Sequence, residues 1–376
     1  MSGAQGLACN GLGEQMRTRR RSTWIFAGLL TLAAVVYGVR LPRLKSFLVG
    51  QDMAQYVTIA FNLVHHGVYS DAETALADAP PAPTAYRPPG YPVFLAAFLR
   101  FDPDLRSRDR HELIGDARER FRGVIMTQKL LYLLVAAGAF AVARQLSGNR
   151  WVGLGAGLMV LFGSATHTMP RLPLSETLTC FFFTAASVCF MFAVVRRHPA
   201  WYALAGLALA LLTLTRASFD YLFWLTLPLL LLTLWRDGRR RRLQVLSLVL
   251  FAAAFCLPVY TWKTRNYVHF GRLFVSQRGG IILSQRAELD MMTWREYSAA
   301  FLYWSNSSVL RDRLMPALFS AEDVADFERT NPAGFFHRSR ERRPELVRKL
   351  AGDRIQADRV LMQEALTRMG QHPLRH

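Results

Sequence analysis

The sequence contains few of the residues that would indicate a disulfide framework, a metal site or a nucleotide-binding loop. It has only four cysteines. Three lie inside strongly apolar stretches and Cys9 lies in the basic N-terminus, so neither disulfides nor zinc coordination is indicated. The adjacent His65 and His66 would point to different sides of a helix, with no third ligand in view. Walker-type loops and dinucleotide-binding glycine patterns are also missing. We therefore expect no metal and no cofactor.

Acidic residues are scarce as well. The chain of 376 residues has 46 Lys and Arg against 27 Asp and Glu, a formal net charge of +19, yet 52% of it is hydrophobic. A soluble protein rarely combines so much positive charge with so much apolar bulk, whereas a membrane protein separates them into loops and spans. Because most of the basic charge is arginine in short loops, nucleic acid is not an expected partner.

Seven apolar segments approach the roughly 20 residues that cross a bilayer core of ~30 Å. They predict an all-α integral membrane protein, a polytopic helical bundle of about seven spans. Two of the segments are short, which leaves their ends poorly defined. The predicted spans are 23–41, 124–143, 151–167, 174–195, 200–215, 217–235 and 243–262.

The short loops predict the orientation. Arginine dominates four of them, which are nearly free of acidic residues: 1–22, 144–150, 196–199 and 236–242. The positive-inside rule places these loops in the cytoplasm. The long loop 42–123 shows no such bias, because it carries as many acidic as basic residues. Alternation of the spans then places this loop and the tail 263–376 on the outer face.

These assignments divide the chain into a cytoplasmic basic tail (1–22), a transmembrane bundle (23–262) that includes the outer loop, and a helical outer segment (263–376). A small-x-small cleavage site does not follow the first apolar segment, so we expect this segment to remain as a span. The style of the outer loop suggests a bacterial source. The prediction is a multi-pass protein of the bacterial plasma (inner) membrane with a cytoplasmic N-terminus.

Within the outer loop, helical spacing of apolar residues through 51–66 predicts an amphipathic helix that lies at the membrane interface and ends at Gly67. Asp52 stands at its start. A proline-rich spacer follows, and then a stiff turn from Arg87 to Pro92. The chemistry-bearing residues of the loop therefore flank an interfacial helix and a rigid turn.

Further helices are expected on the outer face. A second interfacial helix should follow the turn at 92–101, and the alternating charges of 102–122 favour a solvated helix. The tail shows short helical patterns, and apolar residues at helical spacing predict one amphipathic helix at 345–369.

The ordered set of outer segments resembles the polytopic GT-C glycosyltransferases. Its nearest branch looks like the protein O-mannosyltransferase and aminoarabinose-transferase group, including bacterial enzymes that use polyprenyl-phosphate sugars. The resemblance covers roughly residues 20–290, in the same order and on the same side. The matching pieces are GQDMAQYVTIAFNLVHHGVYSD in the first outer loop, YRPPGYPVFLA at the Pro-Gly turn, PLSETL at the start of the fourth span and PVYTWKTRNYVHFGR at the end of the seventh.

The resemblance implies a mechanism and its central residue. A polyprenyl-phosphate sugar would enter from the outer leaflet, and a hydroxyl of a glycan, lipid or protein acceptor would attack its anomeric carbon with inversion. Asp52 would be the general base, or would at least orient the acceptor hydroxyl. A carboxyl with an ordinary pKa near ~4 is a weak base at neutral pH, so burial or a proton-sharing partner would help it. The structural alternative is that Asp52 only caps a helix.

The departing phosphate would need fixed cations, and arginine suits this role through planar, multiple donation to phosphate oxygens. Alternatives remain for each predicted substrate-binding residue. Arg216 could be a snorkelling residue at the end of a span, Arg87 could only hold the turn, and Glu176 could only stabilise its helix. The tyrosines could be ordinary interfacial aromatics. The predicted substrate-binding residues are Arg87, Tyr56, Tyr91, Glu176, Arg216, Arg265 and Asn266.

Two other functions compete with sugar transfer. A transporter or flippase of lipids or glycoconjugates should show interrupted spans in two repeated halves and ionisable groups at mid-membrane. Here the polar residues gather at the outer ends of the predicted spans instead. The chain also stops at His376, where the family usually continues with further spans. This ending leaves open a truncated, non-catalytic accessory subunit.

Overall fold

The computed structural model describes residues 51–73, 80–115, 120–163, 169–236, 241–305, 309–328, 331 and 334–371. The predicted tail 1–22 and the first predicted span at 23–41 lie outside this part of the chain. The structure is 80% helical, and the described residues contain 16 α-helices and no strand. The prediction of an all-α protein is therefore confirmed.

Three helices are long and apolar enough to cross a membrane: α7 (Arg122–Ser147), α9 (Glu176–Arg196) and α12 (Arg241–Phe270). Shorter apolar helices coincide with the other predicted segments that the structure describes: α8 (Arg150–Phe162), α10 (Pro199–Thr215) and α11 (Asp220–Arg236), the last preceded by the 3₁₀ turn Ala217–Phe219. Helix positions thus match the sequence pattern. The number of membrane crossings stays a prediction.

The bundle is held by close helix contacts at glycines. α10 lies between α9 and α12, and the backbones of α10 and α12 approach so closely at Gly206 that an added Cβ would stand 2.2 Å from the carbonyl oxygen of Phe251. On α7, a Cβ at Gly138 would stand 2.3 Å from a methyl group of Thr184 on α9. Small residues at helix crossings are typical of membrane bundles, where packing has to replace the hydrophobic effect.

α11 joins the bundle through aromatic stacking and one ion pair. The rings of Phe223 and Phe255 lie almost parallel with centroids 4.0 Å apart, and Phe251 extends the stack. Close to this stack, Lys263 near the C-terminal end of α12 donates to Asp220 at the N-terminal end of α11 at 2.7 Å. The aromatic stack and the ion pair together hold α11 against α12.

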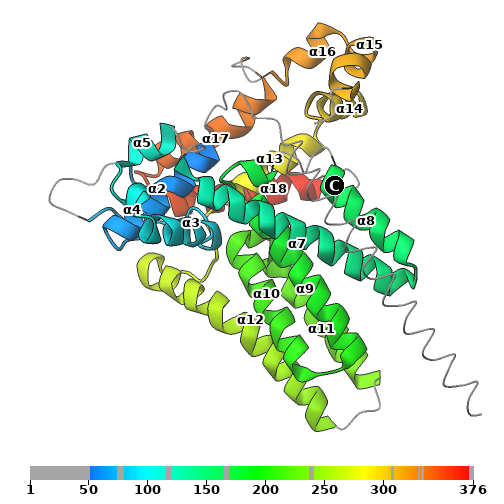
Figure 1. The fold of residues 1–376 in the computed structure, drawn as a ribbon. Coiled ribbons are helices and arrows are strands. Elements are labelled where there is room, and N and C mark those ends of the chain that lie inside the picture. Colours follow the sequence, from blue (N-terminus) through cyan, green and yellow to red (C-terminus); the bar gives the residue numbers. More distant parts are fainter. Residues whose placement is uncertain are drawn as a thin grey trace, which may run out of the picture.

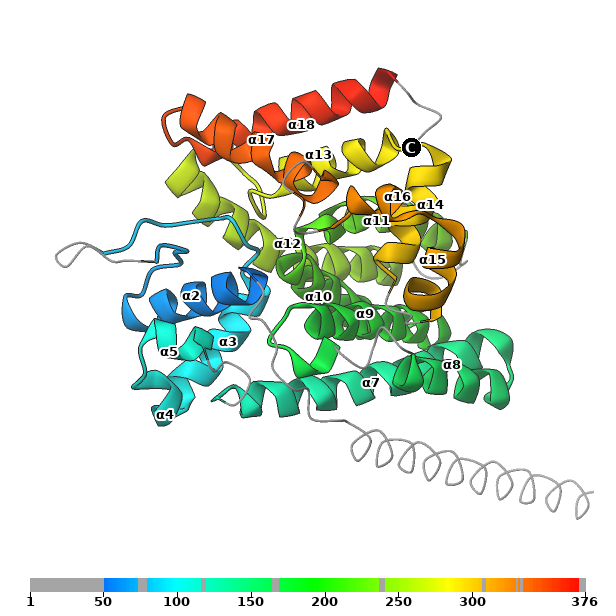
Figure 2. The ribbon, with the colours of Figure 1, turned by 90° about the horizontal axis from the view of Figure 1, so that it is seen from above.

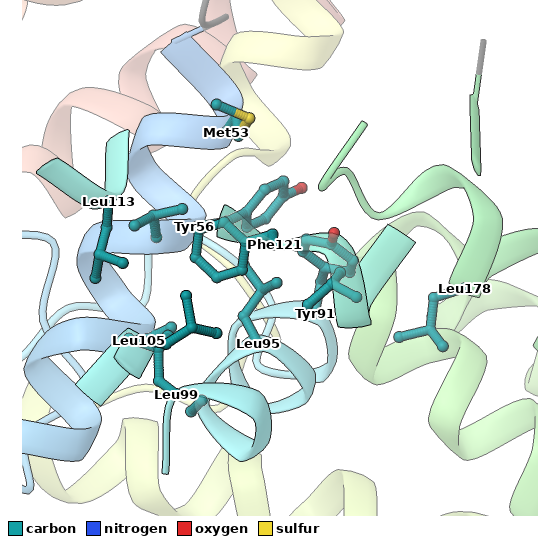
Figure 3. Close-up of a cluster of buried hydrophobic side chains, with 13 residues drawn as sticks. Met53, Tyr56, Tyr91, Leu95, Leu99, Leu105, Leu113, Phe121 and Leu178 are labelled. Atoms are coloured by element: carbon teal, nitrogen blue, oxygen red, sulfur yellow. The ribbon is translucent and has the colours of Figure 1, made fainter. Parts of the chain in front are cut away.

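The described residues of the loop predicted to lie on the outer face form a group of short helices at one end of the bundle (Figures 1 and 2). It contains α2 (Gln51–His65), α3 (Gly90–Phe101), α4 (Pro103–Arg106) and α5 (Arg110–Gly115). Helices are thus present at both predicted places, as α2 and α3, and their position at a membrane interface stays a prediction. Figure 3 shows the buried cluster between them, in which Tyr56 and Tyr91 lie side by side and Leu178 of α9 closes one side.

The charge-dense stretch 102–122 differs from the single solvated helix that was predicted. Asp102 ends α3 and caps α4, its side chain accepting from the amides of Asp104 and Leu105. The apolar Leu105, Leu113 and Phe121 turn into the buried cluster. Leu105 and Leu113 pack inward from the separate short helices α4 and α5, and Phe121 does so from the start of α7, so the segment does not form one straight helix.

The segment 263–376 is helical where the structure describes it, as predicted, and its location on the outer face stays a prediction. It contains α13 (Gly279–Asp290), α14 (Trp294–Tyr303), α15 (Met315–Leu318), α16 (Ala321–Ala325), α17 (Phe335–Lys349) and α18 (Arg354–Gln371), with a π-helical turn at Val309–Leu314. α12 continues without a break to Phe270, so the boundary predicted at 262 falls within a helix. The single helix predicted at 345–369 is wrong, because Ala351 (φ 51°) and Gly352 (φ 91°) reverse the chain between α17 and α18.

We predict that Gly206→Ala destabilises the bundle. The new methyl group would meet the backbone of α12 rather than a flexible side chain, and such overpacking costs about 1–3 kcal/mol. Thermal unfolding in detergent should show a lower midpoint. Gly155→Ala on α8 is the matched control, because open space surrounds that position. A midpoint for Gly206→Ala equal to that of the control would contradict the close approach.

Candidate active site

The centre of the candidate site is an ion pair between Arg87 of the Pro-Gly turn and Asp52 in the first turn of α2. The turn itself is fixed by Tyr69, whose hydroxyl donates to the carbonyl oxygens of Arg87 and Pro88, each at 3.0 Å. Prolines on the C-terminal side of Arg87 restrict the backbone further. The sequence therefore presents the guanidinium to α2 from a rigid support.

Arg87 is only 2% exposed, and its other contacts satisfy the buried charge. Its Nε and Nη2 donate to Oε1 of Gln55 at 2.9 and 2.6 Å. Its guanidinium carbon lies 4.9 Å from the ring centre of Tyr56. Burial opposes the charge, but Tyr56 and Asp52 outweigh it and raise the pKa of Arg87 above its usual value. The site thus carries a permanent cation.

Asp52 is placed differently from the expectation of a buried base. Its side chain is 55% exposed, and its partner is a guanidinium rather than a group that shares a proton. One carboxylate oxygen, Oδ1, accepts from Arg87. Among the described residues, none donates to Oδ2, which is therefore available to an incoming hydroxyl. Its position within the first turn of α2 also favours the helix electrostatically.

The predicted tyrosines connect this centre to the membrane helices. Tyr56 is 6% exposed, and its hydroxyl donates to Oγ of Ser175 at 3.1 Å, directly before Glu176 at the start of α9. Tyr91 is fully buried, donates to Oε1 of Gln128 on α7 at 2.7 Å, and packs edge-on against Tyr56. These contacts favour a packing role over ligand binding for Tyr91. The ring of Tyr56 packs against the guanidinium group of Arg87.

The two residues predicted at the end of the seventh span act as a unit. Arg265 donates to the carbonyl oxygens of Thr84 at 2.7 Å and Tyr69 at 3.3 Å. It also donates to Oδ1 of Asn266, which is fully buried and donates in turn to the carbonyl oxygen of Phe274. Asn266 therefore orients Arg265 rather than facing a ligand. α12 thereby reaches the same segment that carries Arg87.

An apolar groove of about 570 Å³ opens beside this segment. One wall is the turn and the start of α3, and the other walls are α9, α10 and α12. Arg265 is the charged residue in its lining. The groove is lined by Pro89, Gly90, Val93, Phe94, Leu178, Phe182, Leu211, Leu214, Thr215, Pro258, Thr261, Trp262 and Arg265.

The remaining predicted residues, Arg216 and Glu176, do not line the groove. A Cβ on Gly90 would stand 2.6 Å from Oγ1 of Thr215, so the turn rests directly on the end of α10. Arg216 follows there and is exposed. Glu176 is half-buried, and its Oε2 is buried without a hydrogen bond from the described residues. Neither side chain contacts the Asp52–Arg87 pair through a recorded bond.

Sequence reasoning placed Asp52, Arg87 and Tyr56 in one site but missed the residues that hold them. Gln55 was hidden because a glutamine on an interfacial helix gives no distinctive signal. Tyr69 lies near the end of the first outer-loop motif, shortly before the proline-rich spacer. An aromatic residue at that position was the sequence signal that could have identified it. A glutamine inside an apolar span, as at Gln128, is also a usable sign of a buried polar contact.

No known protein family, curated protein or solved structure matches this chain. The described residues also contain no group of three or more His, Cys, Asp or Glu side chains that could hold a metal ion. The chemistry of the site is therefore argued from the side chains above.

We predict that the two partners of the ion pair differ in their effect on stability. Asp52→Asn should cost only about 0–1 kcal/mol, because the Asp52 side chain is exposed and the oxygen of an asparagine amide can still accept from Arg87. Arg87→Gln should cost about 2–3 kcal/mol, because it removes buried hydrogen bonds to charged groups. Thermal unfolding in detergent measures both. Equal losses in the two variants would show that burial of Arg87 does not hold the turn.

Proposed function

We propose that this protein is a membrane glycosyltransferase that moves a sugar from a polyprenyl-phosphate carrier to an acceptor hydroxyl on the outer face. The observation that carries the proposal is that one short segment, residues 84–93, contacts both a carboxylate and an apolar groove. Residues 84–93 hold Asp52 through Arg87 on one side, and they line an apolar groove with Arg265 on the other. An acid and a groove for an anionic lipid therefore adjoin.

The proposed reaction needs one general base and one leaving phosphate. The acceptor hydroxyl hydrogen-bonds to Oδ2 of Asp52 and forms a bond to the anomeric carbon. The bond from that carbon to the phosphate oxygen breaks, and its electron pair leaves with the polyprenyl phosphate. The hydroxyl proton passes to Asp52, and the configuration inverts. Inverting glycosyl transfer uses a carboxylate as the general base at an oxocarbenium-like transition state, and this is the role proposed for Asp52.

The groove suits the carrier in size and chemistry. Its volume falls in the range of about 300–1,000 Å³ that holds small-molecule ligands, and its lining is aliphatic and aromatic apart from threonine hydroxyls and Arg265. A prenyl chain can lie among α3, α9, α10 and α12 while its phosphate meets the guanidinium. Arginine favours phosphate through charge-assisted, bidentate hydrogen bonds.

The arrangement of helix ends supports the proposed topology. The end of α10 and the end of α12 meet segment 84–93 through Thr215 and Arg265, and the start of α9 meets the neighbouring α2 through Ser175 and Tyr56. The sequence predicted all three positions on the outer face from the arginine bias of other loops. In a bacterial inner membrane with the N-terminus in the cytoplasm, the proposed site faces outward.

The proposal predicts that Asp52→Asn abolishes sugar transfer while the protein stays folded. Purified full-length protein would be assayed with radiolabelled polyprenyl-phosphate sugars and a panel of glycan, lipid and protein acceptors. We expect turnover to fall by at least about 100-fold, the usual contribution of a general base. Asp104→Asn is the matched control, because Asp104 is another exposed aspartate of this loop paired with an arginine.

Each outcome of that assay has a meaning. Turnover that survives in Asp52→Asn would exclude Asp52 as the base. Carrier binding without turnover in the unaltered protein would favour an accessory subunit. Movement of the intact carrier across a bilayer would favour a flippase, and absence of carrier binding would reject the transferase proposal.

We also predict that Val93→Trp weakens binding of long polyprenyl phosphates by about tenfold. The indole would fill groove volume, and an overpacking cost of about 1–3 kcal/mol corresponds to a change of this size. A prenyl phosphate with one or two isoprene units should bind with little change. Val152→Trp on α8 is the matched control, because the two valines are 49% and 50% exposed. If both variants bound long polyprenyl phosphates with equal affinity, the prenyl chain would not occupy this groove.

A further inference from the structure

Three arginines from distant parts of the chain gather around Tyr86. The guanidinium carbons of Arg87, Arg278 and Arg343 lie 5.5, 5.3 and 4.6 Å from the centre of its ring. Arg278 directly precedes α13, and Arg343 lies on α17. An aromatic ring stabilises nearby guanidinium groups by cation–π attraction. Like charges nevertheless repel, so the cluster requires compensation.

Arg87 has that compensation in Asp52 and Gln55, but the other two arginines do not. Nε of Arg278 and both Nε and Nη2 of Arg343 are buried, and no described residue accepts a hydrogen bond from them. Buried polar groups without partners are rare, since each one costs free energy. Both side chains are half-buried and approach the same ring. Together they therefore leave several donors to be satisfied by a ligand.

The nearby carboxylate does not fill this need. Asp358 of α18 lies close enough to Arg343 to interact electrostatically, but its two oxygens accept from the amides of Gly280 and Ile281 at 3.1 and 3.2 Å. Burial raises the pKa of Asp358 even though these amides and Arg343 favour the ionised form. The start of α13 is thus already capped, and the free donors belong to the arginines alone.

We infer that Arg278 and Arg343, supported by Tyr86, form a phosphate-binding site that is separate from the groove at Arg265. Paired guanidinium groups with unused N–H donors match the several oxygens of a phosphate and carry the opposite charge. The phosphate could belong to a lipid headgroup or be free in solution. This site does not depend on sugar transfer, because it is built from residues that the proposed reaction does not use.

The site also requires the outer segment to be docked on the outer loop. The amide of Gln277 donates to the carbonyl oxygen of Ala85 at 2.9 Å, and Arg354 pairs with Asp71 at 3.2 Å. Tyr86 is buried in a cluster with Ile281, Leu346 and Leu361. Arg343 is therefore delivered to the ring by the packing of α13, α17 and α18, which lie together in Figure 2.

The test uses the full chain purified in a neutral detergent and two probes, inorganic phosphate and phosphatidic acid in mixed micelles. We expect at least one probe to raise the thermal midpoint of the unaltered protein. Arg278→Gln and Arg343→Gln should each weaken that binding by about tenfold or more, as the loss of a charge-assisted contact implies. Arg343→Lys should restore part of it. Arg348→Gln is the matched control, because Arg348 lies exposed on the same helix.

The two probes and the unliganded variants separate the outcomes. A response to phosphatidic acid alone assigns the phosphate to a lipid headgroup, and a full response to inorganic phosphate assigns it to a soluble ligand. Without ligand, both glutamine variants should keep the midpoint of the unaltered protein, since the buried donors Nε of Arg278 and Nε and Nη2 of Arg343 make no hydrogen bonds and the lost cation–π attraction is offset by relief of repulsion between the guanidinium groups. Absence of a response to either probe, or equal weakening by Arg348→Gln, would overturn the inference.

Discussion

The burial of Arg87 is the constraint on which the rest of the site depends. A guanidinium that is almost removed from water must find a hydrogen-bond acceptor for its N–H groups and a countercharge, and the fold meets both needs from α2. Gln55 and Asp52 lie one turn apart on that helix, so both face the same arginine. The backbone carbonyls of the turn are meanwhile held by Tyr69. Moving α2 by even one turn would break the contacts of Arg87 with both Gln55 and Asp52.

Helix positions were predictable because each depended on local pattern. Long apolar runs became α7, α9 and α12, and the amphipathic stretch after Asp52 became α2, as hydrophobic periodicity alone requires. The predicted helix bounds were wrong where contacts between residues far apart in the sequence determine the structure. Leu105 and Leu113 were read as parts of a charged, solvated helix, yet each finds a place in the buried cluster of α2 and α3. At Ala351 and Gly352 the chain reverses so that α18 can pack on α13, and although Gly352 is a local stop signal, the apolar spacing that continues on both sides of it favoured a single helix.

The sequence predicted the charged residues at the centre of the candidate site but not the residues that surround and hold them. Asp52, Arg87 and Arg265 could be placed on one face because topology alone brings the outer ends of spans together. The partners of Arg87 could not, since a glutamine and a tyrosine are chosen by distance and angle rather than by sequence spacing. Arg278 and Arg343 were invisible for the same reason. They reach Tyr86 from elements that are far apart in the chain.

Segment 84–93 is therefore better understood as a shared wall than as a loop. On one side it faces the exposed carboxylate of Asp52, on another the apolar groove, and on a third the arginines of the outer segment. A flexible loop could not serve three surfaces, because a shift toward one would open the others. The prolines after Arg87, the contact of Gly90 with Thr215 and the docking of Gln277 on Ala85 remove that freedom. Rigidity of this wall, more than any single charge, is what allows an acid, an apolar groove and a cationic cluster to keep a fixed relation to one another.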